Sequence, residues 1–194
     1  MLNKFLSCRA TAPTTIPASK LKHGDVLLYK YVSHASIIDK GIRLITGSFF
    51  VHTSVIQDIG YTKIVLEQLT AQRDFSVLEF YRPDAYVEIH VVRPTFDPPE
   101  TDKSLINHAS YGWVDIWDSL LNHLLGRITF GHWEKKPMLS KNAKVVDCST
   151  LNALALKAVT NCSSWCKYPS VVEPDDYFNH VESFDYLGRV DWES

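Results

Sequence analysis

The chain has 194 residues, 45% of them hydrophobic, with 20 basic and 22 acidic side chains. This length is typical of one domain with a substantial core. The charges are balanced and form no basic patch, which argues against nucleic acid as a partner. The start lacks the apolar run of a signal peptide, and no stretch approaches the roughly 20 apolar residues of a membrane span. We therefore expect a soluble protein made in the cytoplasm, with a virion or a non-classical export route as alternatives; the oligomeric state stays open.

The first half of the chain is predicted to consist mostly of strands. Residues 1–19, with Pro13 and Pro17 among threonines and serines, are expected to form a loose N-terminal arm before a single domain over 20–194. The sequence Asp58-Ile59-Gly60-Tyr61 is typical of a tight hairpin turn, with Gly where φ is positive. Strands are expected over 26–29, 49–57, 61–69 and 85–93, where β-branched and aromatic residues or period-two alternation dominate.

The second half is predicted to be mostly helical. Helices are expected over 37–46, from 101 or 102 to 110, from 113 to 124 and over 147–159. Residues 173–194 hold seven acids, one arginine and interleaved aromatics, and we expect a docked tail with one solvated face. Strands followed by helices indicate an α+β domain.

Cys148 is the first candidate for chemistry. It follows Asp147, a favoured N-cap residue, and so is expected in the first turn of a helix. The exposed N–H groups and the helix dipole stabilise a thiolate there and lower the pKa of the thiol. Such a thiolate can attack a carbonyl carbon, and the same N–H groups can stabilise the oxyanion that forms. Helix position alone leaves open the alternative of a small buried thiol without chemistry.

His52 is the second candidate, because an imidazole has no obvious structural task within a strand. If the turn consists of Ile59 and Gly60, His52 pairs with Glu67, and the two side chains face each other roughly 5 Å apart at Cβ. The carboxylate would then orient the imidazole, as the third member of a triad does. The alternative is a polar pair at the sheet surface, and a one-residue change in register would separate the two.

Several segments together resemble a known family. The sequence Val146-Asp147-Cys148-Ser149-Thr150-Leu151 is similar to the Asp-Cys-Ser-x-Leu nucleophile motif of NlpC-type cysteine peptidases. The segment from Thr46 to Ile56 resembles the catalytic-histidine strand of the YiiX/YaeF-type permuted papain-like amidases. Residues 21–28 and 65–67 resemble the strands on either side. Family members often carry an aromatic residue before the cysteine and a Glu after the serine, where this chain has Asp147 and Thr150.

The resemblance implies a circularly permuted papain-like domain, in which a small antiparallel sheet packs against the cysteine-bearing helix. It implies a cysteine hydrolase that cleaves an amide, peptide or isopeptide bond through a thioester, in cell-wall peptides for many relatives. Cys148 would be the nucleophile, His52 the base and Glu67 the residue that orients His52, with no metal and no cofactor; Tyr29 and Ser36 would line the cleft. The alternatives are a lipid-directed acyltransferase or thioesterase similar to lecithin retinol acyltransferase, a non-catalytic phage or virion protein that keeps the fold, and a deamidating toxin.

Three other cysteines compete for a role. The order Cys8, His52, Glu67 would match the unpermuted relatives, but no apolar helical stripe follows Cys8. Cys162 and Cys166 have a spacing that suggests metal, but no second Cys/His pair accompanies them at the spacing of a zinc site. We therefore expect loop thiols or a packed corner there.

Overall fold

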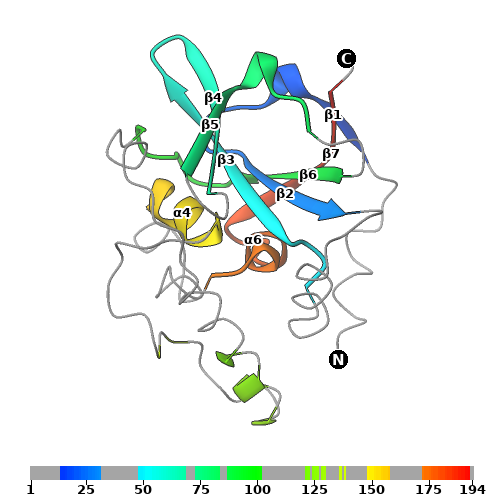
Figure 1. Cartoon of the computed structure of the whole chain (residues 1–194), viewed down its shortest axis with the longest axis vertical. Helices are drawn as coiled ribbons and strands as arrows, with labels where there is room; N and C mark the ends of the chain where they lie inside the picture. The colour runs from blue at the N-terminus through cyan, green and yellow to red at the C-terminus, as the bar shows by residue number, and fades with distance from the viewer. Residues whose placement is uncertain are drawn as a thin grey trace.

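The computed structural model describes residues 14–31, 48–68, 73–83, 87–101, 148–157 and 172–192, and positions 121, 122, 124–126, 128, 129, 136 and 138. Its elements, labelled in Figure 1, are β1 (Thr15–Pro17), the 3-10 helix η2 (Ala18–Lys20), β2 (Val26–Tyr31), β3 (His52–Ile59), β4 (Thr62–Gln68), β5 (Arg73–Val77), the 3-10 helix η3 (Leu78–Phe80), β6 (Val87–Pro94), α4 (Cys148–Ala155), α6 (Pro174–Asn179) and β7 (Phe184–Asp191). The described part of the chain is therefore mixed α and β, as expected.

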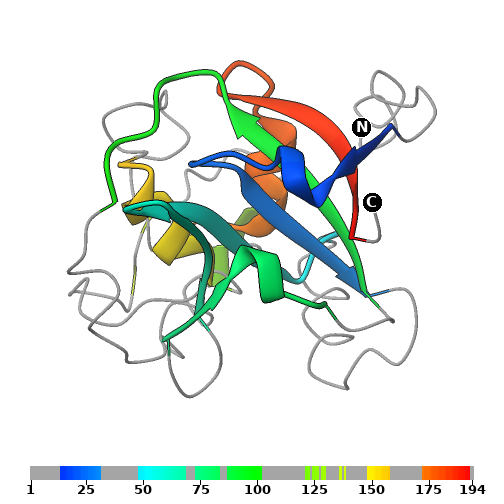
Figure 2. The ribbon, with the colours of Figure 1, turned by 90° about the horizontal axis from the view of Figure 1, so that it is seen from above.

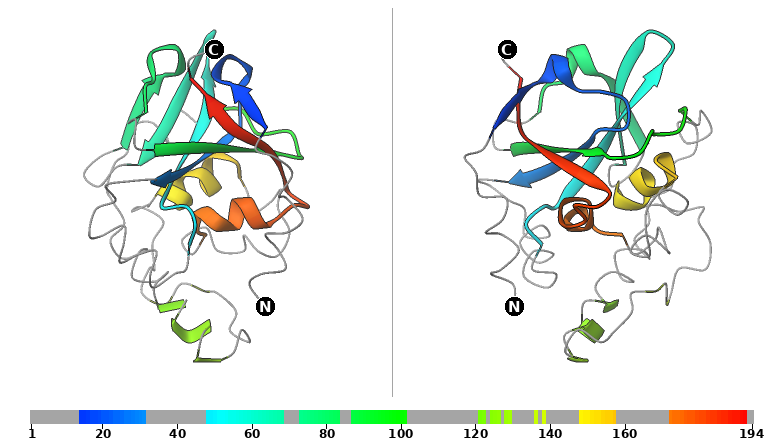
Figure 3. Two further views of the ribbon diagram at one scale, coloured as in Figure 1. Left: turned by 90° about the vertical axis from the view of Figure 1, so that its right-hand side faces the viewer. Right: turned by 180° about the vertical axis from the view of Figure 1, so that it is seen from behind.

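One seven-stranded sheet organises these elements, in the order β1-β7-β6-β2-β3-β4-β5. Every neighbouring pair is antiparallel except β1 and β7, which run parallel. Figures 1 and 2 show that the sheet is strongly curled. Figure 3 shows α4 and α6 next to each other below the sheet. The cysteine-bearing helix α4 packs against β3 and β4.

Alternating residues of the strands build two cores. The face toward α4 and α6 carries Val55 and Leu66, which pack with Leu151 of α4 and Tyr177 of α6. The opposite face carries a second cluster, formed by Leu21, Leu27, Tyr29, Ile56, Val65, Ile89, Val91 and Val190. Because side chains alternate between the two faces of a strand, neighbours such as Val55 and Ile56 belong to different cores. The sheet is buried on both faces, and its register is fixed on both.

The hairpin of β3 and β4 has a different register from the predicted one. Ile59 pairs with Thr62, so Gly60 and Tyr61 form the turn, instead of Ile59 and Gly60. Gly60 has φ 62° and occupies the first central position, which is the place of Gly in a type II′ turn. The pairing is therefore shifted by two residues relative to the prediction. Since side chains repeat with period two, the shift leaves every side chain on its predicted face.

The expected tail over 173–194 is an integral part of the sheet, which corrects the interpretation as a docked tail. Residues 174–179 form α6, and residues 184–191 form β7 between β1 and β6. The expected loose arm is also shorter than 1–19, because Thr15–Pro17 pairs with Arg189–Asp191 of β7. Strand β5 was not expected either. The sequence signal was weak in these segments because charged residues and Gly188 interrupt the apolar pattern.

The other expected elements are confirmed with altered bounds or lie outside the described residues. Strand β3 begins at His52 instead of position 49, β4 ends at Gln68, and β6 runs from Val87 to Pro94. The expected helices over 37–46 and 102–110 lie outside the described residues, as does 113–120. Positions 121, 122 and 124–126 are helical. Within the described residues, no helix has the length and apolar character needed to cross a bilayer.

Gly188 is predicted to be essential for the closure of β7 onto β1. Its φ is 122°, and a Cβ at this position would lie 1.8 Å from the backbone oxygen of Thr14. We expect Gly188→Ala to lower the free energy of unfolding by about 3 kcal/mol or more, because the strained backbone and the clash add. Urea unfolding followed by circular dichroism measures this loss.

The matched control is Gly60→Ala. Gly60 also has a positive φ, but a Cβ there would meet no atom within 4 Å. This variant is expected to lose only about 1 kcal/mol. Equal losses in the two variants would contradict the importance of the β1–β7 contact.

Candidate active site

Cys148 is the first residue of α4 and is partly exposed. The helix that carries it is firmly held, because Leu151 and Leu156 are fully buried in the core under the sheet. Asp147, the expected cap, lies outside the described residues. The Sγ of Cys148 lies 4.0 Å from the Oγ of Ser149. The sequence thus placed the thiol correctly at the beginning of a helix that packs on the sheet.

His52 and Glu67 are in direct contact across the β3–β4 hairpin. The Nε2 of His52 lies 3.1 Å from the Oε2 of Glu67, and 18% and 10% of the two side chains are exposed. The prediction that they pair directly was wrong, because Ser54 is the residue opposite Glu67. His52 lies two positions along β3, as a diagonal neighbour about 7 Å away, within reach of two long side chains. The shift by two residues preserved the contact because both residues stayed on the same face.

Cys148 is near enough to the His52 imidazole to affect its pKa. Burial of the imidazole lowers its pKa, but the charge and hydrogen bond of Cys148 raise it, as do the hydrogen bond and charge of Glu67. Together these effects raise the pKa of His52 to about 10. Nε2 is engaged by Glu67, which leaves Nδ1 available to a second partner. The structure thus brings His52 and Glu67 into contact and places Cys148 where it affects the same imidazole.

Tyr29 supports this group from β2. Its Cα is paired with that of His52, and its ring centroid lies 4.9 Å from the imidazole. The hydroxyl shares hydrogen bonds with Ser54 Oγ at 2.7 Å and Tyr81 Oη at 2.8 Å. Burial raises the pKa of Tyr29 well above its ordinary value, and the charges of Tyr81 and Glu67 add to the shift. The phenol therefore stays neutral and fixes one side of the imidazole.

The sequence interpretation assigned Tyr29 to the cleft, whereas the structure buries it to 6% exposure beside His52. Ser54 and Tyr81 were missed. Ser54 was detectable, because it follows His52 by two positions on a predicted strand and must share its face. Tyr81 lies after η3 and comes close only through the curl of the sheet. Ser36 lies outside the described residues.

Asp25, in the segment that resembles the Gly-Asp strand, has a structural position. Its carboxylate is fully buried, lies 2.7 Å from the Nε of Arg93, and accepts the N–H of Lys22 at 2.8 Å. Gly24 before it has φ 84°. The pair shapes the entry into β2 and ties that strand to β6.

The competing cysteines Cys8, Cys162 and Cys166 lie outside the described residues. Within those residues, no cluster of three or more His, Cys, Asp or Glu side chains has the arrangement of a metal site.

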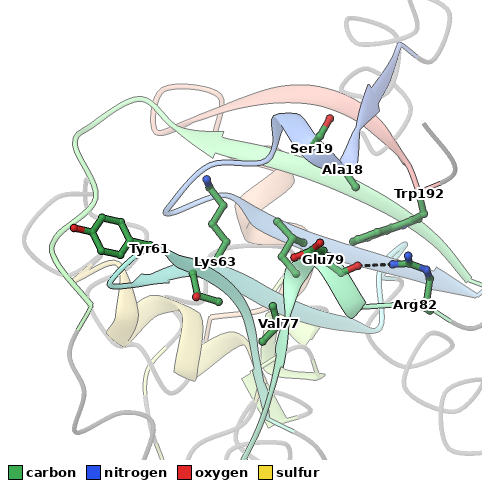
Figure 4. A pocket seen from close by; sticks show the side chains of 10 residues that line it. Ala18, Ser19, Tyr61, Lys63, Val77, Glu79, Arg82 and Trp192 are labelled. Atoms are coloured by element: carbon green, nitrogen blue, oxygen red, sulfur yellow. Dashed lines mark hydrogen bonds between the residues drawn. The ribbon is translucent and has the colours of Figure 1, made fainter.

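A groove of about 450 Å³ lies at the other end of the β3–β4 hairpin, near its turn. Figure 4 shows its lining, which includes Tyr61, Lys63, Val77, Glu79, Arg82 and Trp192. The guanidinium of Arg82 donates to the backbone oxygens of Glu79 and Tyr81. None of Cys148, His52 and Glu67 lines this groove, so it does not define their substrate cleft.

Comparison of the sequence with protein-family models and with curated proteins gave no match. A functional interpretation of this chain therefore depends on its own geometry. The central feature of that geometry is an imidazole that contacts a carboxylate and whose pKa is raised by a nearby thiol.

The pKa of His52 is predicted to depend on both of its neighbours. An ordinary histidine loses its proton near pH 6.5, whereas His52 keeps it up to about pH 10. We expect Cys148→Ala to lower the pKa of His52 strongly, because burial then opposes the charged ring with only Glu67 to support it. Glu67→Gln is expected to lower the pKa less. NMR titration of the labelled histidine ring nitrogens measures both shifts.

The remaining histidine resonances in each sample provide the reference for the titration. If the pKa of His52 is the same in Cys148→Ala as in the parent protein, the sulfur does not contact the imidazole. A larger effect of Glu67→Gln than of Cys148→Ala would contradict the proposed order of the two contributions.

Proposed function

We propose that the chain is a thiol hydrolase that cleaves an amide or peptide bond through a thioester intermediate, with Cys148, His52 and Glu67 as its catalytic group. One observation carries the proposal. The imidazole of His52 is hydrogen-bonded to Glu67, and the charges and hydrogen bonds of Cys148 and Glu67 raise the pKa of His52 to about 10. A protonated imidazole beside the sulfur is the partner that a nucleophilic thiolate requires.

The reaction would proceed in two halves. The thiolate of Cys148 attacks the carbonyl carbon, and the backbone N–H groups at the start of α4 stabilise the oxyanion. His52 gives its proton to the leaving amine as the C–N bond breaks, which leaves a thioester on Cys148. His52 then takes a proton from water, and the hydroxide attacks the thioester carbonyl. The acid product leaves, and the thiolate and imidazolium are restored.

Glu67 would orient the imidazole throughout. Its hydrogen bond to Nε2 directs Nδ1 toward the sulfur, and its negative charge stabilises the imidazolium. Tyr29 limits the rotation of the ring from the side of β2. Because these groups are already in place before substrate binds, little reorganisation is needed at the moment of reaction.

The permuted papain-like fold is part of the proposal. A sheet whose strands supply His52 and Glu67, packed on a helix that begins with Cys148, supports it. The order His, Glu, Cys along the chain also agrees with the permuted arrangement. The resemblance implies peptide or amide substrates, with cell-wall peptides among the alternatives.

Lipid-directed acyl transfer is the second candidate, because Cys148, His52 and Glu67 could equally form and resolve a thioester with a fatty acyl group. Leu124 and Ile128 favour it, since 52% and 62% of these apolar residues are exposed. An exposed apolar surface of this kind would suit an acyl chain or a membrane. Sedimentation with liposomes distinguishes the candidates: binding that is lost in a Leu124→Ser, Ile128→Ser variant favours the lipid-directed activity.

Alkylation by iodoacetamide tests the nucleophile. We expect Cys148 to react well before the other three cysteines at about pH 6.5, where only about one free thiol in a hundred is ionised. His52→Ala should remove this advantage, because the imidazolium that supports the thiolate is gone. Peptide mass spectrometry across a pH series measures the rate at each cysteine.

The matched control is His180→Ala. His180 also pairs with a carboxylate, since its Nδ1 lies 2.8 Å from Glu182, but this pair does not include Cys148. Its loss should leave the alkylation rate unchanged. If Cys148 is inert in the folded protein while Cys8, Cys162 or Cys166 reacts, the hydrolase proposal fails, and a non-catalytic protein with this fold becomes the better interpretation.

A further inference from the structure

Helix α6 is hydrogen-bonded beside both members of the reactive pair, to the segment before His52 and to the residue after Cys148. It lies in the C-terminal segment, far along the sequence from His52, and it contributes two polar side chains at positions i and i+2. Asp175 binds the segment that leads into β3, and Tyr177 binds the first turn of α4. We refer to Asp175 and Tyr177 together as the α6 brace.

Asp175 fixes the backbone immediately before His52. Its carboxylate accepts the N–H of Phe49 at 2.9 Å and 3.2 Å, and the N–H of Phe50 at 3.1 Å. Burial raises the pKa of this carboxyl, while the N–H groups of Phe49 and Phe50 and a hydrogen bond from Ser48 oppose the shift. The side chain of Phe50 is 1% exposed and packs on Phe178 of α6, with ring centroids 5.4 Å apart. The start of β3 is therefore tied to α6 through both backbone and side chain.

Tyr177 fixes the backbone immediately after Cys148. The side chain is fully buried, and its hydroxyl donates to the carbonyl oxygen of Ser149 at 2.7 Å. In a helix, that oxygen also accepts an N–H from the next turn. The phenol thus adds a second bond, which resists any movement of the first turn of α4.

Helix α6 is itself rigidly mounted. Glu173 and Asp176 form a reciprocal capping box at its start, and Pro174 occupies the first turn. The ring of Tyr177 packs edge-on against Phe184 of β7 at 5.4 Å. Because α6 holds residues 49–50 and the first turn of α4, its own position must be fixed by other contacts. The capping box and the packing of Tyr177 on β7 provide these contacts.

We propose that the α6 brace sets the separation between Cys148 and His52, so that Asp175 and Tyr177 are positioning residues of the site. The inference rests on the proposed function for its catalytic meaning. The reason is geometric. Asp175 binds the N–H groups two and three positions before His52. Tyr177 bonds the residue next to Cys148, and both side chains belong to one short helix. A hydrogen bond between sulfur and nitrogen weakens steeply with distance, so release of either end lowers both thiolate formation and the pKa of His52.

The test uses Tyr177→Phe and Asp175→Asn in the full chain. Each should slow alkylation of Cys148 at about pH 6.5 by roughly threefold to thirtyfold, since a misplacement of 1 Å costs about a hundredfold and a smaller one is expected. Near pH 10, where ordinary thiols are ionised, the rates should converge with the parent rate. The NMR titration should show a lower pKa for His52 in both variants.

Tyr186→Phe is the control. Its hydroxyl bonds the Nδ1 of His90 at 2.8 Å, and its ring packs on Phe178, so it belongs to the same core as Tyr177 and bonds a histidine other than His52. A purely structural role for Tyr177 predicts that both Phe variants lower the melting temperature and neither changes the pH profile. That result would overturn the proposal. If Asp175→Asn does not fold, Tyr177→Phe alone still tests the proposal, because it removes only the hydroxyl oxygen and keeps the buried ring.

The two proposals fail in distinguishable ways. If Cys148 reacts fast and needs His52, but the brace variants have the parent pH profile and the parent pKa of His52, the brace is wrong and the hydrolase stands. If Cys148 is inert in the parent protein, the hydrolase proposal fails. The pKa of His52 then decides the brace alone, because a lowered value in Tyr177→Phe supports it and an unchanged value overturns it.

Discussion

The register of the β3–β4 hairpin is the constraint on which the rest of the site depends. Glu67 reaches His52 only because both side chains lie on one face, two positions apart along the ladder. That register is fixed twice: Gly60 sets the turn, and the cores on the two faces require Val55 and Ile56 to point in opposite directions. A change by one residue would exchange the two cores and separate imidazole from carboxylate. The energy that specifies the site is therefore hydrophobic, although the site itself is polar.

The side chains of the candidate active site become steadily less exposed from the thiol to the tyrosine behind it. The Cys148 thiol is partly open to solvent, the imidazole and Glu67 are mostly covered, and Tyr29 behind them is almost fully buried. Burial strengthens each charge interaction and penalises an unpaired charge. In such a setting, a protonated imidazole needs nearby groups that offset the cost of burying its charge. This explains why the pKa of His52 depends on Cys148 and Glu67 together.

Much of the fold and of the candidate site could be predicted from the sequence, and the exceptions have physical causes. Local patterns found β2, β3, β4, β6 and the helix that begins with Cys148. The turn was misplaced because Gly was assigned to the second central position, whereas a type II′ turn has it first. Strand β7 was missed because a bulge opposite Val91 and Val92 interrupts the alternation around Gly188. The contacts of α6 with residues 49–50 join segments more than a hundred positions apart along the chain, and its contact with Ser149 spans 28 positions. No local pattern records either of them.

The parallel pairing of β1 with β7 has a consequence for the order in which the molecule forms. Strand β7 lies between β1 and β6, so β1, near position 15, can join the sheet only after β7, near position 190, has paired. Contacts so distant form slowly, because a long loop must close before they contribute. During synthesis, the β3–β4 hairpin leaves the ribosome before α6 and β7 do. A nascent chain that has not yet released residues 174–191 would thus hold the hairpin without the helix that contacts residues 49–50 and Ser149.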